Sequence, residues 1–213
     1  MDLLTGLFKD LGKITATNWY IIASVMILSI IFLLVKPKAR PNIKTLVYGG
    51  LFVTIAFVLY HIRFFRWPQG GSVTLASMLP IFVYAHIFGT RAGVAAGTAF
   101  GFLRFIQGAY ILHPFQVILD YFVSFAALGL AGFAKQNLSV GILLGSFGRF
   151  FGTFLSGVIF FGSYAPEGMN PVIYSMAVNG AVVGVDAVIC FIVALIPQVK
   201  NVVAIMRREA GDR

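Results

Sequence analysis

Seven continuous apolar segments of about twenty residues each dominate this chain and restrict the folds open to it. They lie at about 18–35, 43–62, 72–88, 91–108, 114–134, 139–162 and 171–198. A run of about twenty apolar residues is what an α-helix needs to cross the hydrocarbon core of a membrane. The strands of an outer-membrane barrel would alternate in hydrophobicity over about ten residues, and these segments do not. The pattern therefore predicts an all-α polytopic membrane protein.

The composition agrees with this prediction and excludes several classes of function. Of the 213 residues, 59% are apolar and 11% are charged, against about 45–50% and about 25% in soluble domains. The basic residues lie mostly between the spans, so the net charge of +9 indicates no nucleic-acid partner. Cys190 is the single cysteine, and the three histidines show no metal-ligand spacing, so we expect neither a metal site nor a cofactor. No phosphate-binding loop of the GxxxxGK[ST] type is present, so the chain is not expected to hydrolyse ATP.

The first apolar segment is separated from the other six by a basic linker with two prolines, Lys36–Pro41. Proline stops a helix, so this linker divides the chain. We expect an extra N-terminal transmembrane helix and linker at 1–42, a six-helix membrane domain at 43–198 and a basic cytoplasmic tail at 199–213.

The distribution of Lys and Arg predicts the orientation, because cytoplasmic loops are enriched in them. With the N-terminus outside and the C-terminus in the cytoplasm, ten lie on the inner side: Lys36, Lys38, Arg40, Lys44, Arg91, Lys135, Lys200, Arg207, Arg208 and Arg213. Only four lie outside: Lys9, Lys13, Arg63 and Arg66. In this orientation three loops rich in aromatic residues and proline, at 64–71, 109–116 and 161–171, share the outer side. We expect them to form the mouth of one pocket.

Four charged residues well inside the spans, Arg104, Asp120, Arg149 and Asp186, need a partner or a polar cavity, because charge in a membrane span is costly. Asp120, followed by Tyr121, is the leading candidate for a ligand contact, and the alternative is a structural ion pair with Arg104 or Arg149. Arg149 lies in a glycine-rich span, where a structural role is the main alternative to a ligand role. Asp186, nearer the inner end of the last span, is expected to pair helices.

Several other residues have both a functional and a plain interpretation. Trp67, beside Pro68, is either an interfacial belt residue or an aromatic lid that stacks on a flat or cationic group. Asn179 offers a donor and an acceptor to a heteroaromatic ligand, and its alternative is an interhelix contact. Tyr174 is about 140° away from it on the same helix, so the two would reach one pocket from different sides.

Small residues spaced four apart occur on two spans and predict close helix contacts. On the fourth span Gly93, Gly97 and Gly101 are expected to pack inside the bundle. On the second span Gly50 and Thr54 lie towards the predicted inner face, where the helix of a partner subunit is an alternative to internal packing.

Three motifs then resemble a known family. Pro68–Ser72, His113–Tyr121 and above all Gly157–Gly168, with Pro171–Gly180, are similar to the ThiT family, the thiamine-binding S components of prokaryotic energy-coupling factor (ECF) transporters. The similarity covers about residues 43–198. It implies a six-helix bundle with an outward-facing pocket between the last three helices and under the first loop. It also implies a complex with one membrane T subunit and two ATPases in the prokaryotic cell membrane.

The resemblance also implies the roles of individual residues. Trp67 would cover the ligand, and the pair Asp120 and Tyr121 would contribute to the pocket, as would Tyr174 and Asn179. Further pocket positions of the family fall on Arg149, Thr153, Gly157 and Phe161. The family's Ala-x-x-x-Ala coupling motif is matched approximately by Gly50 and Thr54.

Two positions depart from the family pattern and concern the ligand. Thr153 stands where many members carry His, and Phe161 stands where some carry Trp. The resemblance therefore implies the fold more strongly than it implies the choice of thiamine over a precursor or analogue. The function expected is thiamine capture for an ATP-driven importer, with no chemistry performed on the vitamin. The alternatives are a solitary ion-coupled carrier that uses Asp120 or Asp186 as its titratable group, and a membrane-embedded enzyme, which no motif supports.

Overall fold

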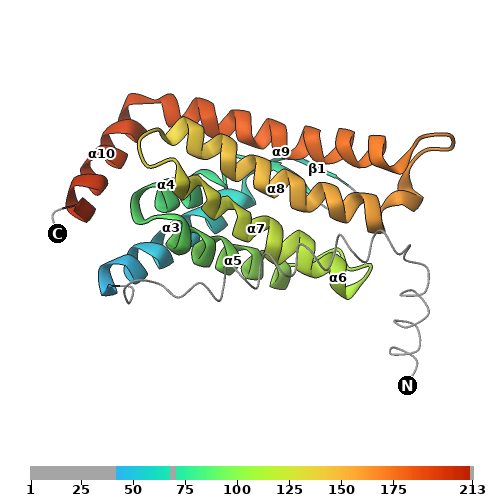
Figure 1. Ribbon diagram of the computed structural model, residues 1–213, viewed down its shortest axis with the longest axis horizontal. Coiled ribbons are helices and arrows are strands. Elements are labelled where there is room, and N and C mark those ends of the chain that lie inside the picture. Colours follow the sequence, from blue (N-terminus) through green and yellow to red (C-terminus); the bar gives the residue numbers. More distant parts are fainter. Residues whose placement is uncertain (1–41, 68–70, 212–213) are drawn as a thin grey trace, which may run out of the picture. The chain divides into compact units, whose positions relative to one another are not determined.

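A computed structural model describes residues 42–67 and 71–211. Its elements are α3 (Ile43–His61), β1 (Arg63–Arg66), β2 (Ser72–Thr74), α4 (Leu79–Phe88), α5 (Thr90–Ile106), α6 (Pro114–Val117), η1 (Ile118–Val123), α7 (Ser124–Ala126), η2 (Ala127–Phe133), α8 (Leu138–Phe160), η3 (Gly162–Tyr164), α9 (Pro171–Leu195) and α10 (Pro197–Gly211) (Figure 1). The extra N-terminal helix and most of its linker, predicted at 1–42, lie outside the described residues apart from Asn42, which caps α3.

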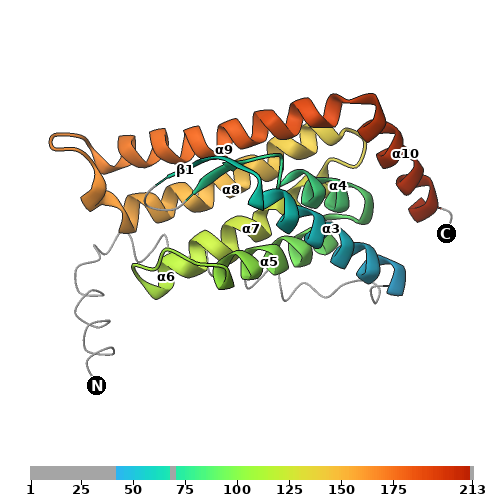
Figure 2. The same ribbon diagram turned by 180° about the vertical axis from the view of Figure 1, so that it is seen from behind.

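Six helical segments make up the bundle: α3, α4, α5, the continuous segment 114–133, α8 and α9 (Figures 1 and 2). The all-α prediction is thereby confirmed. Four of them, Ile43–His61, Pro114–Phe133, Leu138–Phe160 and Pro171–Leu195, are long and apolar enough to cross a membrane. The helices α4 and α5 are shorter, at 10 and 17 residues.

The predicted span at 72–88 is wrong in its first part. Ser72–Thr74 forms strand β2, which pairs with β1 as an antiparallel hairpin, and the helix begins only at Leu79. An apolar run of this length is compatible with a strand or a helix, so hydropathy alone did not separate them. Ala76, with a φ of 54°, makes the turn after the strand, and Pro80 lies in the first turn of α4.

The last predicted span, 171–198, ends earlier than expected. Ile196 has an extended backbone, with φ −60° and ψ 128°, and Pro197 begins a separate helix. The residues predicted as a basic tail at 199–213 therefore lie mostly in α10, which turns away from the end of α9 (Figures 1 and 2).

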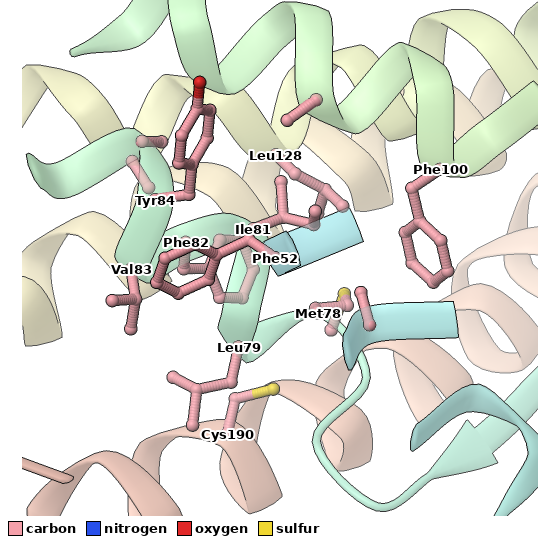
Figure 3. Packing of buried hydrophobic residues seen from close by; sticks show 14 of the residues in the cluster. Phe52, Met78, Leu79, Ile81, Phe82, Val83, Tyr84, Phe100, Leu128 and Cys190 are labelled. Carbon is pink, nitrogen blue, oxygen red and sulfur yellow. The ribbon is translucent and has the colours of Figure 1, made fainter. Parts of the chain in front are cut away.

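The core lies where α4 is surrounded by the other helices. Side chains from five helices meet there, and Figure 3 shows them converging: Phe52, Met78, Ile81, Phe82, Phe100, Leu128 and Cys190. Cys190 is fully buried among them and is a small residue of the core.

The glycines of α5 bring that helix against the backbone of the segment 114–133. A Cβ at Gly97 would overlap the carbonyl oxygen of Phe125, and one at Gly101 would overlap the carbonyl oxygen of Tyr121. Internal packing of these glycines is therefore confirmed. The contact also fixes the height of Asp120 and Tyr121 in the bundle.

Replacing Gly101 with alanine is expected to destabilise the protein, because the obstacle is backbone and cannot rotate away. Overpacking of this kind costs about 1–3 kcal/mol or more. Gly50→Ala is the matched control, since nothing lies within 4 Å of a Cβ there. Thermal unfolding of both variants in detergent should show a lower midpoint for Gly101→Ala alone. Equal midpoints would mean that α5 is not held against this backbone.

Candidate functional site

One cavity of about 110 Å³ gathers side chains from α3, the hairpin, α5, the segment 114–133, α8 and α9. All nine of the residues predicted to bind a ligand line it: Trp67, Asp120, Tyr121, Arg149, Thr153, Gly157, Phe161, Tyr174 and Asn179. A single water needs about 10–15 Å³, so the cavity has room for a group several times larger than one water. That these residues bind a ligand stays a prediction.

The hairpin over the cavity is held by Asp186. Its carboxylate, 1% exposed, accepts hydrogen bonds from the backbone N–H of Thr74 at 3.2 Å and from the Thr74 hydroxyl at 2.9 Å. At the tip of the hairpin, the backbone N–H of Trp67 donates to the backbone carbonyl of Gly71 at 3.0 Å. Asp186 has the structural role expected of it, but its partner is a strand and not a helix.

A π-helical turn positions the acid and tyrosine of the cavity. Asp120 and Tyr121 lie in η1, a short π-helix inside an otherwise α- and 3₁₀-helical segment. The Ser124 hydroxyl donates to the Leu119 carbonyl at 2.7 Å across this turn. A π-turn is wider than an α-turn, so successive side chains diverge less, and both residues line the same cavity. Such turns occur often at functional sites, and nothing in the sequence signalled this one.

Gln116, which the sequence analysis did not single out, positions Asp120. It is 1% exposed, and its amide nitrogen donates to the Asp120 carboxylate at 2.6 Å and to the Tyr110 carbonyl at 3.1 Å. Its amide oxygen accepts from the Leu112 N–H at 3.1 Å. The spacing of four residues between Gln116 and Asp120 was the available signal, because such pairs are neighbours on a helix.

Aromatic side chains from two loops meet at the rim of the cavity. The Tyr110 and Tyr164 hydroxyls are hydrogen-bonded at 2.7 Å, and the ring centroid of Phe161 lies 6.0 Å and 5.9 Å from theirs. The bond to Tyr164 raises the pKa of Tyr110. The Tyr110 N–H also donates to the Tyr121 hydroxyl at 3.0 Å. The three loops expected to form one mouth thus supply the same cavity with Trp67, Tyr110 and Phe161.

Both arginines of the cavity lie over aromatic rings. The Arg104 guanidinium carbon is 3.2 Å from the Tyr60 ring centroid, and that of Arg149 is 4.5 Å from the Phe125 centroid. Arg104 also donates to the Gln107 amide oxygen at 3.1 Å. Within residues 42–67 and 71–211, Asp120 has no ion pair within 4.0 Å, so the structural pairing considered for it is not observed there. Its carboxylate remains available to a ligand.

The contact between α8 and α9 requires a glycine at position 157. A Cβ there would overlap the Ser175 hydroxyl, which donates to the Phe154 carbonyl at 2.8 Å. The Asn179 amide nitrogen donates to the Ser175 carbonyl at 3.1 Å. This close approach brings Tyr174 and Asn179 to the cavity together although they lie on different sides of the helix.

Thr153 uses its hydroxyl within its own helix. It donates to the carbonyls of Arg149 at 3.2 Å and Phe150 at 3.1 Å, as hydroxyls in membrane helices commonly do. No group of three or more His, Cys, Asp or Glu side chains able to hold a metal ion occurs in the described part of the chain.

Comparison with known proteins agrees with this architecture. Residues 46–206 match the family described as Thiamine transporter protein (Thia_YuaJ). The chain is 37% identical to thiamine transporter ThiT of Bacillus subtilis over 147 residues, which cover 61% of this chain and 76% of that protein. It is also 37% identical over 123 residues to ThiT of Lacticaseibacillus paracasei, covering 48% and 61%.

A solved structure shows the same fold. ThiT from Listeria monocytogenes superposes with a TM-score of 0.65 at 24% identity, over 77% of this chain and 93% of that one. The family match spans all six helical segments of the bundle apart from the first turn of α3. This multi-pass membrane protein therefore belongs to the thiamine transporter family.

Proposed function

We propose that the chain captures thiamine in the cavity described above and delivers it, as the S component, to an ATP-driven ECF importer. The observation that carries the proposal is the gathering of one carboxylate, two amides and several aromatic rings around one cavity of the described structure in a member of this family. The chain itself supplies binding and orientation, and the energy comes from separate ATPase subunits.

The lining suits the two halves of thiamine. Its aminopyrimidine presents an edge of donors and acceptors, which suits the carboxylate of Asp120 and the amide of Asn179. Its thiazolium is a permanent cation, and cations are attracted to aromatic faces such as those of Trp67, Tyr121 and Phe161. Arg104 and Arg149 lie over the rings of Tyr60 and Phe125, so neither arginine covers these three faces.

The cavity mouth is proposed to face the outside of the cell. The excess of Lys and Arg between the other ends of the spans, ten against four, supports this orientation. It places the N-terminus outside and the C-terminus in the cytoplasm, where ATP is available to the partner subunits.

The face of α3 that carries Gly50 and Thr54 is proposed to contact the T subunit. Both residues are exposed, and nothing lies within 4 Å of a Cβ at Gly50. The Thr54 hydroxyl donates to the Gly50 carbonyl at 2.9 Å, so it adds little polarity to this face. Small residues allow close approach of a foreign helix in the membrane.

Thiamine is expected to quench tryptophan fluorescence of the purified chain through Trp67. The other of the two tryptophans, Trp19, lies in the N-terminal segment. A fluorescence titration of the parent and of Trp67→Phe should therefore show quenching in the parent and little in the variant. Trp19→Phe is the matched control and should keep the quenching. Unchanged quenching in Trp67→Phe would remove the lid role of this residue.

A solitary carrier driven by an ion gradient is the second candidate. It is favoured by the Asp120 carboxylate in the cavity, which is hydrogen-bonded to Gln116 but has no ion pair among the described residues. Uptake of labelled thiamine into cells that lack other thiamine importers distinguishes the ECF subunit from the solitary carrier. The proposal predicts uptake only when the T subunit and both ATPases are expressed with the chain. Uptake by the chain alone that disappears with the proton gradient would support the carrier.

A further inference from the structure

A second cavity, of about 660 Å³, lies at the opposite end of the bundle from the proposed thiamine site. It is bounded by the end of α4, the start of α8, the end of α9 and one face of α10. Helix α8 connects the two, since its first residues line this cavity and its last lead to Phe161 at the other. Figures 1 and 2 show α10 turning away from α9 at this end, far from η3.

Three cations line this cavity: Lys200, Arg207 and Arg208. Among the residues that the structure describes, no Asp or Glu lines it. Spacings of seven and eight residues put all three on one face of α10. The acid that follows them, Glu209, accepts a hydrogen bond from the Tyr48 hydroxyl at 3.2 Å and so is engaged with α3. The face of α10 towards the cavity is thus a cluster of three cations.

Neutral donors complete the lining. Gln136, Asn137 and Ser139, at the start of α8, add amide and hydroxyl groups. They stand at the N-terminus of a 23-residue helix, where the Asn137 side-chain oxygen accepts from the N–H groups of Ser139 and Val140 and the peptide dipoles favour an anion nearby. The group that fits cations and neutral donors together is an anion with several oxygen acceptors, such as a phosphate.

The depth of the cavity indicates where that phosphate comes from. Leu195, at the end of the apolar helix α9, lines it, so it lies at the level where the hydrocarbon core ends. Val202 and Ile205, 54% and 56% exposed, are on the side of α10 away from its cations. A helix with a basic side and an exposed apolar side is typical of the membrane interface, where lipid headgroups are concentrated.

We propose that this cavity binds the phosphate group of an anionic phospholipid through Lys200, Arg207 and Arg208. The bound headgroup would hold α10 across the end of the bundle, against α4 and α9. The site is independent of thiamine binding and needs no partner subunit.

The test uses the full chain, purified in detergent, and native mass spectrometry to count bound lipids. The probes are dioleoyl phosphatidylglycerol, which is anionic, and dioleoyl phosphatidylcholine, which is not. The parent should bind phosphatidylglycerol at least tenfold more tightly. The triple variant Lys200→Gln, Arg207→Gln, Arg208→Gln should lose at least tenfold of that affinity. The matched control, Lys44→Gln, Arg91→Gln, Lys135→Gln, removes three cations from the same end but outside the cavity and should lose less than twofold.

The outcomes separate this site from general surface charge and from a soluble anion. Equal losses in the two triple variants, or no preference for phosphatidylglycerol in the parent, would overturn the proposal. Inorganic phosphate and glycerol phosphate at millimolar concentration should not displace the lipid, and displacement would assign the cavity to a soluble phosphate. If the triple variant does not fold, as judged by circular dichroism, the single charge reversal Arg207→Glu should still lower the affinity at least fivefold.

Discussion

Replacing Gly50 with leucine is expected to abolish thiamine uptake by cells while the purified chain still binds thiamine with nearly its parent affinity. Gly50 lies on an exposed face of α3 with nothing within 4 Å of its Cβ position, so a larger side chain fits the isolated chain without strain. The proposed thiamine cavity is at the other end of α3, where Tyr60 lines it. Bulk at Gly50 therefore blocks a foreign helix and leaves the cavity intact.

The matched control is Gly184→Leu on α9, because Gly184 is also exposed and also has nothing within 4 Å of a Cβ. Accumulation of labelled thiamine is measured in cells that express the T subunit and the ATPases, and affinity is measured in detergent. The control should keep both. Loss of uptake and binding together in Gly50→Leu would mean that Gly50 only stabilises the bundle, and retention of both would move the docking face away from α3.

The change Asp120→Asn is expected to weaken thiamine binding about ten- to a hundredfold. It removes the one carboxylate among the described residues that line the cavity, and the amide that replaces it has nearly the same shape. A hydrogen bond to a charged group in a shielded site contributes about 1.5–3 kcal/mol, which corresponds to this loss. Isothermal titration calorimetry of the purified variants with thiamine measures it directly.

Asp186→Asn serves as the comparison, because Asp186 is also a carboxylate inside the bundle but bonds to the hairpin. In this variant the side-chain amide oxygen of the new asparagine can still accept from Thr74. The expected loss of thiamine affinity is therefore small, and a modest fall in thermal stability is the main effect. An equal or larger loss of affinity in Asp186→Asn than in Asp120→Asn would reverse the assignment of the ligand-binding acid.

The sequence was informative about features that depend on residues close together in the chain. Span length and hydropathy identified the six helical segments, and the resemblance to a known family pointed to the nine residues that line one cavity. These features can be recognised in the sequence because a membrane helix needs a continuous apolar run and a pocket inside a membrane protein needs a few polar groups.

What the sequence did not reveal depends on local backbone geometry and on contacts distant in the chain. The hairpin that carries Trp67 is held by Asp186, 112 residues beyond its partner Thr74. The amino-acid composition of the π-turn at Asp120 does not distinguish it from an α-helix, because Ile, Leu, Tyr and Phe are equally compatible with an α-helix. Gln116 was visible only as an ordinary polar residue until its three hydrogen bonds were known.

The most direct test of the account is equilibrium dialysis of labelled thiamine against the purified chain, with no ATP and no other subunit present. A capture subunit with one cavity of this kind predicts saturable binding of one thiamine per chain, competed by unlabelled thiamine. No saturable binding to a chain shown by circular dichroism to be folded would contradict the assignment of the cavity to thiamine.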